Sequence, residues 1–416
     1  MKLTADQQGM LEGESGPALQ WAMQFHHSVG EFFDAPDMVP ISSAHFAPDS
    51  RMMGPVGQTL MDRLIAQGAG VSVPSYMDPC GVDFERLTQF VDEFNVPEDY
   101  VEAERRAANA ARALGFLPTF TCINYQTISP PRFGEHLGWG DTGAAICANA
   151  LFGARTNFEA GASALAAALT GSVPAYAMHL GDGRKGTLSV RIDAEPREIS
   201  DWGAIAAWIG TLEPGYHTVP VIHGDFQPPG FNSLKQLGVA LASYGSHAMF
   251  HLVGATPEAQ SLEAAFQGQV PETEVVCDAA AIESIYDRHS LEIGDVDLVV
   301  FAAPQLAIDE VVEVVNRLGS RRVHQNTQLL LAVGPQVKAE ADRAGLTEQL
   351  RNAGGNFLTG TCFYGEAPLL GPLNDWRSLV TNSTKLVNTL MPSGLEVAFE
   401  PLERCLEAAV TGRLNA

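Results

Sequence analysis

The sequence predicts an α/β protein whose sheets are mainly parallel and doubly wound. Short apolar segments alternate with segments of helical periodicity along most of the chain, which is the pattern of parallel strands joined by helices. At 416 residues the chain is too long for one core, so two or three domains are expected. A hydrophobic content of 46% with 18% charged residues is that of an ordinary globular protein.

The N-terminal third supplies three predicted strands. The segment MVPISSAHF, residues 38–46, has the apolar character of a buried strand and ends near His45. A second strand, VSVPSY, leads to a turn at Asp78. A third strand, LPTFT at residues 117–121, is followed at once by Cys122. Helical patterns separate these strands, as parallel pairing requires.

The middle and C-terminal parts continue the alternation. Residues 175–192 have the pattern of a hairpin that turns at Gly181-Asp182-Gly183. The last third is the clearest doubly wound unit, with strands DLVVFAAP, QLLLAVG and NFLTGTCF between helical segments. Cys362 lies just past the last of these strands, where a helix N-terminus favours a thiolate.

The net charge and the cysteine content exclude several classes of protein. A net charge of −24 argues against nucleic acid or an anionic membrane as partner, because phosphates are held by Lys and Arg. No apolar run approaches the roughly 20 residues that span a bilayer, and MKLTADQQGM lacks the apolar core of a signal peptide. Six scattered cysteines do not suggest a disulfide framework. A cytoplasmic protein with reduced thiols is therefore predicted.

Reactive side chains gather where the predicted strands end. His45, Asp78 and Cys122 each follow a strand, and ligands of parallel sheets collect beyond the carboxyl ends of the strands. The Gly-rich loop of residues 131–142 comes soon after Cys122. Its carboxylate and imidazole groups belong to Glu135, His136 and Asp141.

Motifs for nucleotide binding, zinc proteases and serine hydrolases are absent from the sequence, and three chemistries stay open. A thiol nucleophile could use Cys122 with His45 or His136 as its base. A mononuclear metal could be held by His45, Glu135 and Asp141. An iron–sulfur cluster would need about three thiolates, leaving one iron open as a Lewis acid.

Long stretches in chain order resemble one family. They are VPISSAHF, GAGVSVPSYMDPCGVD, FTCINY, FGEHLGWGDTGAAICANALFGARTN, MFHLVGATPEA, TGTC, VTNSTK and CLEAAVTGR. Together they resemble the large subunit of aconitase X, a branch of the aconitase superfamily of hydro-lyases. The resemblance implies three α/β domains around a central cleft, over residues 1–165, 166–290 and 291–416. It also implies a separate small swivel-domain subunit that carries a serine base and without which the chain is inactive.

The resemblance implies a dehydratase of small hydroxy acids, with cis-3-hydroxy-L-proline as the first expected substrate and mevalonate 5-phosphate as the alternative. In this β-elimination a base removes a proton beside a carboxylate while a Lewis-acidic iron takes the leaving hydroxide. The family's cluster cysteines correspond to Cys122 and Cys362. The substrate contacts correspond to Phe46, Ala47, Pro48, Asp49, Ser50, Asp78, Pro79, Asp141, Thr142 and Lys385. The candidate catalytic residues are His45, Glu135, Asp141 and Lys385.

The chain departs from the family pattern at two places. The family's Gly-Cys-Pro-His run is Ala302-Ala303-Pro304-Gln305 here, so the third cluster cysteine is replaced by Ala303 and an imidazole is lost. Cys80 is a hypothetical replacement ligand, and a mononuclear iron or another divalent metal is the alternative to an iron–sulfur cluster. The mevalonate branch has a phosphate-contacting Gly-Val-Ser where this chain has Pro48-Asp49-Ser50, and an aspartate repels phosphate. A catalytically degraded, non-enzymatic partner subunit is the competing function class.

Overall fold

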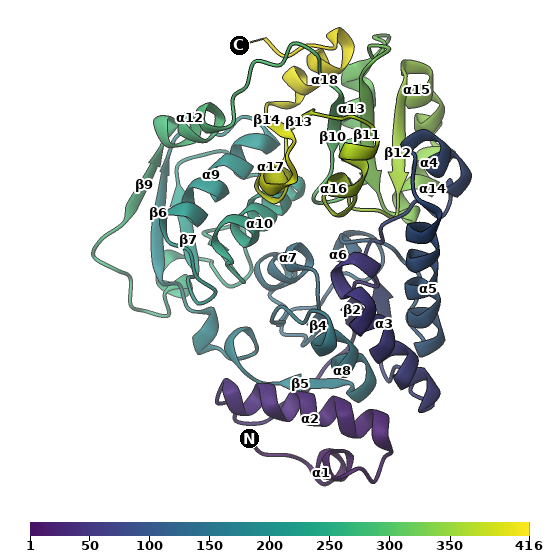
Figure 1. Cartoon of the computed structure of the whole chain (residues 1–416). Helices are drawn as coiled ribbons and strands as arrows, with labels where there is room; N and C mark the ends of the chain where they lie inside the picture. Colours follow the sequence, from purple (N-terminus) through teal and green to yellow (C-terminus); the bar gives the residue numbers. More distant parts are fainter. Residues whose placement is uncertain (416) are drawn as a thin grey trace.

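A computed structural model describes residues 1–415 of the chain and contains four β-sheets within them (Figure 1). Three of these sheets are wholly parallel and the fourth is a two-stranded antiparallel pair. The predicted α/β class with mainly parallel sheets is therefore confirmed. No helix among residues 1–415 has the length and the apolar run that crossing a membrane would take.

The N-terminal part holds a parallel sheet of order β3-β2-β4 and the antiparallel pair β1-β5. The strands are β1 (Met38–Pro40), β2 (Ala44–Phe46), β3 (Ser75–Met77), β4 (Gly138–Trp139) and β5 (Ser172–Pro174). The helices are α1 (Ala5–Glu12), α2 (Pro17–Phe32), α3 (Ser50–Ala66), α4 (Leu87–Phe94), α5 (Glu98–Leu114), α6 (Asn124–Thr127), α7 (Thr142–Phe152) and α8 (Ala162–Thr170). Small residues of α8 let it pack closely on this sheet, because a side chain at Gly138 would meet Ala167 at 2.9 Å.

The middle part is a parallel sheet of order β8-β7-β6-β9, with α9 and α10 packed together beside it. The strands are β6 (Leu188–Asp193), β7 (Pro220–Gly224), β8 (His251–Leu252) and β9 (Val275–Asp278). The helices are α9 (Ile199–Leu212), α10 (Phe231–Gly245), α11 (Leu262–Ala265) and α12 (Ala279–Arg288), preceded by the 3₁₀ turns η1 (Ala177–His179) and η2 (Asp182–Arg184). Helix α10 also contacts α7 and α17, so it connects the three parts of the molecule.

The C-terminal part is a five-stranded parallel sheet of order β12-β11-β10-β13-β14. The strands are β10 (Leu298–Phe301), β11 (Gln328–Val333), β12 (Gly355–Thr359), β13 (Ser378–Thr381) and β14 (Glu396–Phe399). The helices are α13 (Ile308–Leu318), α14 (Pro335–Arg343), α15 (Leu346–Ala353), α16 (Phe363–Leu373), α17 (Thr384–Leu390) and α18 (Leu402–Thr411), with the 3₁₀ turn η3 (Met391–Ser393). The winding reverses between β10 and β13, which makes the crevice at their carboxyl ends the expected ligand position.

Two predicted strands of the N-terminal third are wrong in detail. Residues 38–46 form two strands in different sheets, because Pro40 has no N–H to continue the first ladder and the chain then crosses to β4. Residues 117–121 form no strand. Pro118 lacks a donor, and Phe120 has a φ of 45°, a left-handed conformation that breaks an extended run.

The predicted hairpin over residues 175–192 is also wrong. Its first half forms the two 3₁₀ turns, and the strand that follows pairs in parallel with β7. The cause is Arg184, whose side chain is almost fully buried. Its guanidinium pairs with Glu258 and donates to the carbonyl of Asn149 at 3.0 Å, which draws the turn inward and away from a hairpin path.

Candidate active site

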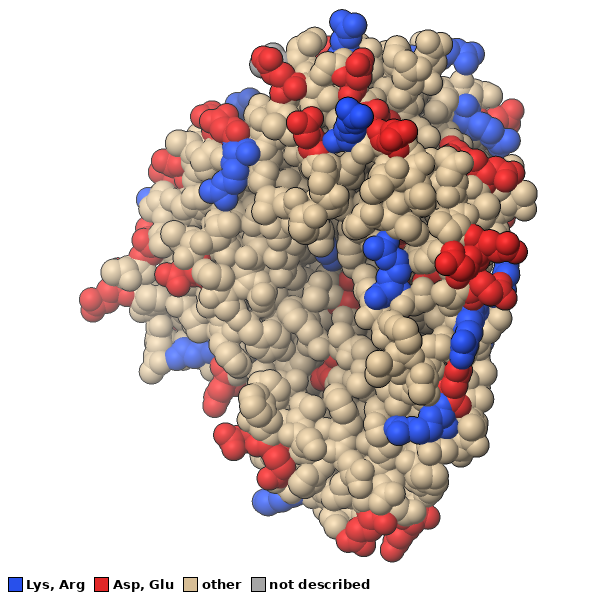
Figure 2. Space-filling model, viewed as in Figure 1, with Lys and Arg blue, Asp and Glu red and all other residues tan. Residues whose placement is uncertain are grey.

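The site lies where the carboxyl ends of the N-terminal and C-terminal sheets face each other. The turn after β3 meets the end of β12, since the N–H of Cys80 donates to the carbonyl of Gly360 at 3.0 Å. Figure 2 shows a hollow near the middle of the displayed face, with acidic and basic atoms inside and a mostly uncharged rim. In the same view the hollow lies between α7 below and α16 and α17 above (Figure 1).

A buried ion pair forms one side of the site. Lys385 Nζ lies 3.9 Å from Asp141 Oδ2, and both side chains are only 9% exposed. Asp141 is held because its other oxygen accepts the N–H of Ala144 at 2.7 Å as the N-cap of α7. Lys385 lies in the first turn of α17, which Ser383 caps. Two helix starts thus fix the cation and its partner.

Asp78 and His45 lie beside this pair. His45 Nε2 is 3.0 Å from the carbonyl of Thr121 and 3.4 Å from Asp78 Oδ1. Burial lowers the pKa of His45 to about 4, so the imidazole is neutral at pH 7 and its one proton goes to Thr121. The pKa of Asp78 is raised by burial and by Asp141, while Lys385 opposes the shift. The contact of Asp78 with His45 is therefore not an ion pair.

The two predicted ligand cysteines are brought together with these groups. Cys122 is buried and Cys362, the N-cap residue of α16, is partly exposed. Burial raises the pKa of Cys362, and the next contribution is the nearby thiol of Cys122. Lys385 favours the thiolate form of both. The lysine cluster, defined as Lys385, Asp141 and Asp78, thus lies near both thiols.

Tyr364 and Gln305 belong to the site although the sequence did not single them out for it. The Tyr364 ring lies under the ammonium of Lys385 at 5.9 Å, within cation–π distance. The pKa of Tyr364 is raised by burial and then by Cys362. Gln305 contacts Cys122 directly, since its N–H donates to the sulfur at 3.4 Å. For Gln305 the signal was its place at the family's lost imidazole, and for Tyr364 it was the position two residues past Cys362.

A second set of acidic groups, the carboxylate cluster, consists of Asp49, Glu104 and Glu366. All three are buried, and Glu366 Oε2 has no hydrogen-bond partner among the described residues. Burial raises the pKa of Glu104 and of Glu366, and Asp49 is the next cause in both. Asp49 also raises the pKa of Asp78, so the two clusters are close enough to influence each other.

Glu104 explains how two predicted substrate loops are held. From α5 it accepts the N–H of Ser50, after β2, and the N–H of Gly81, after β3, both at 2.7 Å. These two bonds connect the loop of residues 46–50 with the turn at Asp78. Gly81 is required here, because a side chain would collide with Tyr100 at 1.8 Å.

Other predicted residues lie outside the two clusters. The Glu135 carboxylate accepts the N–H of Arg132 within its own loop at 2.6 Å, so it stays a catalytic prediction without a contact to Lys385. The ring of Phe46 packs on Phe116 in the core, and only its backbone reaches the site by accepting the N–H of Asp78. The remaining predicted contacts, Ala47, Pro48, Pro79 and Thr142, lie in the loops after β2 and β3 and at the start of α7.

Cys80 lies with the carboxylate cluster. Its thiol donates to the carbonyls of Val82 at 3.3 Å and Gly360 at 3.5 Å. Burial and the neighbouring Glu104 raise its pKa, which disfavours the thiolate that a metal needs. These contacts describe a packed thiol, and its role as a third ligand stays a hypothesis.

The sequence resemblance to aconitase X implies a metal or an iron–sulfur cofactor, and the side chains at the site can be compared with the ligands that such a group needs. Two thiols are available at Cys122 and Cys362, and Ala303 stands where the resemblance places the third. Within residues 1–415, no three His, Cys, Asp or Glu side chains have the geometry of a metal site. The donor set therefore does not fit a three-thiolate cluster.

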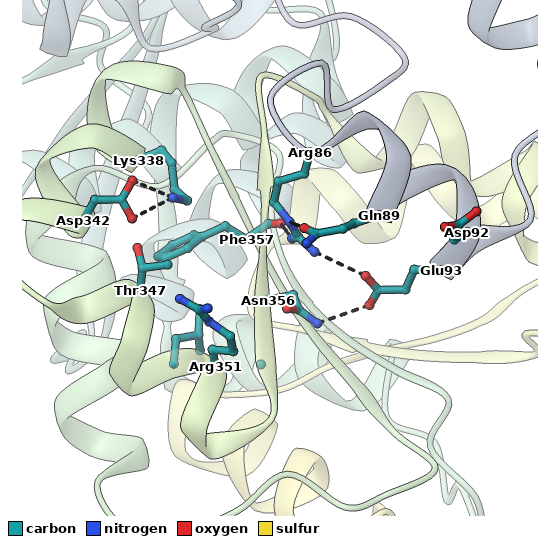
Figure 3. A pocket seen from close by; sticks show the side chains of 12 residues that line it. Arg86, Gln89, Asp92, Glu93, Lys338, Asp342, Thr347, Arg351, Asn356 and Phe357 are labelled. Carbon is teal, nitrogen blue, oxygen red and sulfur yellow. Dashed lines mark hydrogen bonds and ion pairs between the residues drawn. The ribbon is translucent and has the colours of Figure 1, made fainter.

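A cavity of ≈ 620 Å³ between α4 and the free edge of β12 is separate from this site. Figure 3 shows that its charged side chains are largely paired with one another: Lys338 with Asp342, and Arg86 with Glu93. Arg86 also donates to the carbonyl of Phe357 at 2.7 Å, which closes the edge of the strand. The cavity is therefore a crevice between two parts of the fold.

Comparison with known proteins agrees with this architecture. Three family models match the chain: Aconitase X first domain over residues 1–182, Aconitase X second domain over 186–287 and Aconitase X third domain over 296–411. A crystal structure of Thermococcus kodakaraensis aconitase X in its holo-form superposes with a TM-score of 0.87 at 27% identity, covering 98% of this chain and 100% of that one.

Curated relatives are dehydratases. The phosphomevalonate dehydratase large subunit of Thermococcus kodakarensis is 30% identical over 98% of this chain and 100% of its own length. The cis-3-hydroxy-L-proline dehydratase of Pseudomonas aeruginosa is 31% identical over 100% of this chain and 71% of its own length. The fold, the site and these relatives define a hydro-lyase, an enzyme that removes water from its substrate. The chain belongs to the aconitase X family.

Proposed function

We propose that the chain is the large subunit of a dehydratase for a small hydroxy acid that carries an amino group, with cis-3-hydroxy-L-proline as substrate. The observation that carries the proposal is that Lys385 is a buried cation whose neighbours are mainly carboxylates, with little other positive charge nearby. Lys385 offers a binding partner for the substrate carboxylate. The carboxylate cluster favours a protonated amine and repels a phosphate.

The substrate assignment depends on the charge of the site, because sequence identity to the relatives does not distinguish phosphomevalonate dehydratase from cis-3-hydroxy-L-proline dehydratase. Phosphomevalonate dehydratase at 30% and cis-3-hydroxy-L-proline dehydratase at 31% are equally similar to this chain. A phosphate would bring two further negative charges beside Asp49, and the cation that acts on the carboxylate cluster is Arg51, an exposed side chain bonded to the carbonyl of Gly365. Phosphomevalonate is therefore the second candidate, supported by the named relatives and opposed by Asp49.

Asp78 supplies the proton in the proposed elimination. A base removes the proton beside the substrate carboxylate, its electron pair forms the C=C bond, and the C–O bond breaks. The raised pKa of Asp78 keeps its proton available for the leaving hydroxide, which departs as water. Neutral His45 lies beside Asp78, with its Nε2 3.4 Å from Asp78 Oδ1. The donor set does not fit a three-thiolate cluster, and the elimination is therefore derived from the side chains alone.

The base is proposed to come from a small swivel-domain subunit. Relatives named as large subunits support such a partner, and the hollow in Figure 2 leaves the site open to a covering chain. A cytoplasmic location is part of the proposal and is supported by six cysteines that are all free of disulfides.

The test is a dehydration assay with the chain and its small subunit together. We expect loss of water from cis-3-hydroxy-L-proline, followed by mass spectrometry, and slower or no reaction of mevalonate 5-phosphate. Dehydration of the phosphate ester alone would overturn the substrate assignment. A complex that dehydrates neither compound nor related hydroxy acids would support the non-enzymatic alternative.

A further inference from the structure

The side chain of Gln305 lies between the segments that carry the two thiols. Its Oε1 accepts the N–H of Cys122 at 3.4 Å, and its Nε2 donates to the carbonyls of Phe120 at 3.2 Å and Thr361 at 3.1 Å. Thr361 directly precedes Cys362. Gln305 is 0% exposed, so these bonds form away from bulk water. One amide therefore joins both cysteine segments.

The backbone of Gln305 is fixed from the other side. Its N–H donates to the Cys122 sulfur at 3.4 Å, and its carbonyl accepts from Lys235 Nζ at 3.3 Å. Lys235 is fully buried on α10 and pairs with Glu310 of α13. Glu310 also accepts the N–H of Ala307 at 2.8 Å. The middle part of the fold thus holds the backbone while the side chain reaches the other two parts.

We propose that Gln305 is a positioning residue that keeps the Cys122 and Cys362 segments at a fixed separation before any ligand binds. The inference rests on the proposed site at the two thiols. Cys122 follows an irregular segment with no strand of its own, and Cys362 follows β12 of another sheet. An amide offers one acceptor and two donors of fixed geometry, and here all three are directed at these segments.

A general role in core stability is the competing explanation, and the chain offers a matched control for it. Gln336 of α14 is partly buried, and its Nε2 donates to the carbonyl of Thr119 at 3.1 Å. It therefore makes the same kind of bond to the segment that precedes Cys122. The bond does not reach Cys122 itself or the segment of Cys362. Gln336→Met removes a comparable bond without touching the proposed positioning contacts.

The experiment uses dibromobimane, a reagent that alkylates two thiols, releases two bromide ions and becomes fluorescent when it bridges them. The full-length chain is labelled without substrate, and mass spectrometry gives the fraction of label that joins Cys122 to Cys362. Cys122→Ser and Cys362→Ser, each alone, identify the bridged product. The variants are Gln305→Met, which loses the acceptor and both donors, and Gln305→Glu, which loses only the donors.

We expect the wild type and Gln336→Met to give mainly the bridged product, and Gln305→Met to lose the bridge several-fold in favour of singly labelled thiols. Gln305→Glu gives an intermediate loss, and it serves as the test if Gln305→Met does not fold. In the reconstituted dehydratase kcat falls while KM changes little, because Gln305 does not contact substrate.

Equal bridging in the wild type and both Gln305 variants overturns the inference, as does an equal loss in Gln336→Met. A wild type in which both Cys122 and Cys362 are labelled but only singly also overturns it, since the two reactive thiols are then not held as a pair. Bridging is measured without turnover. An inactive complex that still bridges therefore refutes the proposed function and leaves the positioning role intact.

Discussion

The lysine cluster and the carboxylate cluster are neighbours, yet they place opposite demands on a ligand. The first contains a cation, Lys385, whose charge is balanced by Asp141. The second contains three acidic groups, and burial and mutual repulsion raise the pKa of Glu104 and Glu366. Under the proposed function, this difference favours a ligand with a negative and a positive end. Four predictions test that difference, beginning with the largest effect.

Removal of the cation has the largest expected effect. Lys385→Met leaves Asp141 without its counter-charge and removes the proposed partner of the substrate carboxylate. We expect kcat/KM to fall about 30- to 1000-fold, or ~2–4 kcal/mol, as for the loss of one partner of a buried charge pair. Steady-state kinetics measures this. Lys338→Met is the control, because Lys338 pairs with Asp342 outside the site, and an equal loss there would contradict the assignment.

Neutralising the other cluster has a smaller and selective effect. Asp49→Asn keeps the shape of a side chain that accepts the N–H groups of Arg51 and Met52. We expect kcat/KM for hydroxyproline to fall about tenfold and discrimination against the phosphate substrate to relax. Both substrates are compared in one assay. Asp62→Asn, on the same helix but paired with Arg106 at the surface, should change neither rate, and unaltered selectivity in Asp49→Asn would count against the proposed polarity.

Asp78 links the clusters to pH. Its pKa is raised in the folded protein, so between its ordinary value of about 3.9 and the raised value the folded chain binds more protons than the unfolded chain. Its contribution to the free energy of unfolding therefore decreases as pH rises through that window. Asp78→Asn removes this pH-dependent loss of stability. The melting temperature of the variant minus that of the wild type should therefore increase from pH 4 towards neutrality. A difference that does not depend on pH would contradict the raised pKa.

Cys80→Ser has the smallest expected effect. Serine can keep a donor towards the carbonyls of Val82 and Gly360, so the free energy of unfolding should change by about 1 kcal/mol. Activity should persist. Cys122→Ser, in contrast, should abolish turnover, because Cys122 lies near the lysine cluster and contacts Gln305. Loss of activity or of bound iron in Cys80→Ser would instead establish it as the missing ligand.

Much of the site could be predicted from where strands end. His45, Asp78, Cys122 and Cys362 were expected at carboxyl ends of parallel strands, and the structure places them in one region. The prediction of a strand before Cys122 was wrong, yet the cysteine still lies at the site. Its segment is held by hydrogen bonds to Met77 and not by a sheet ladder.

The sequence by itself determined the α/β class, the acidic charge and the residue types that reach the strand ends, because apolar periodicity and turn residues are local properties of the chain. Only the tertiary structure decided which strand ends face one another. Gln305 meets Cys122 across 183 residues and Thr361 across 56, and Glu104 meets Ser50 across 54. Such contacts depend on the packing of one sheet against another, which no local pattern encodes.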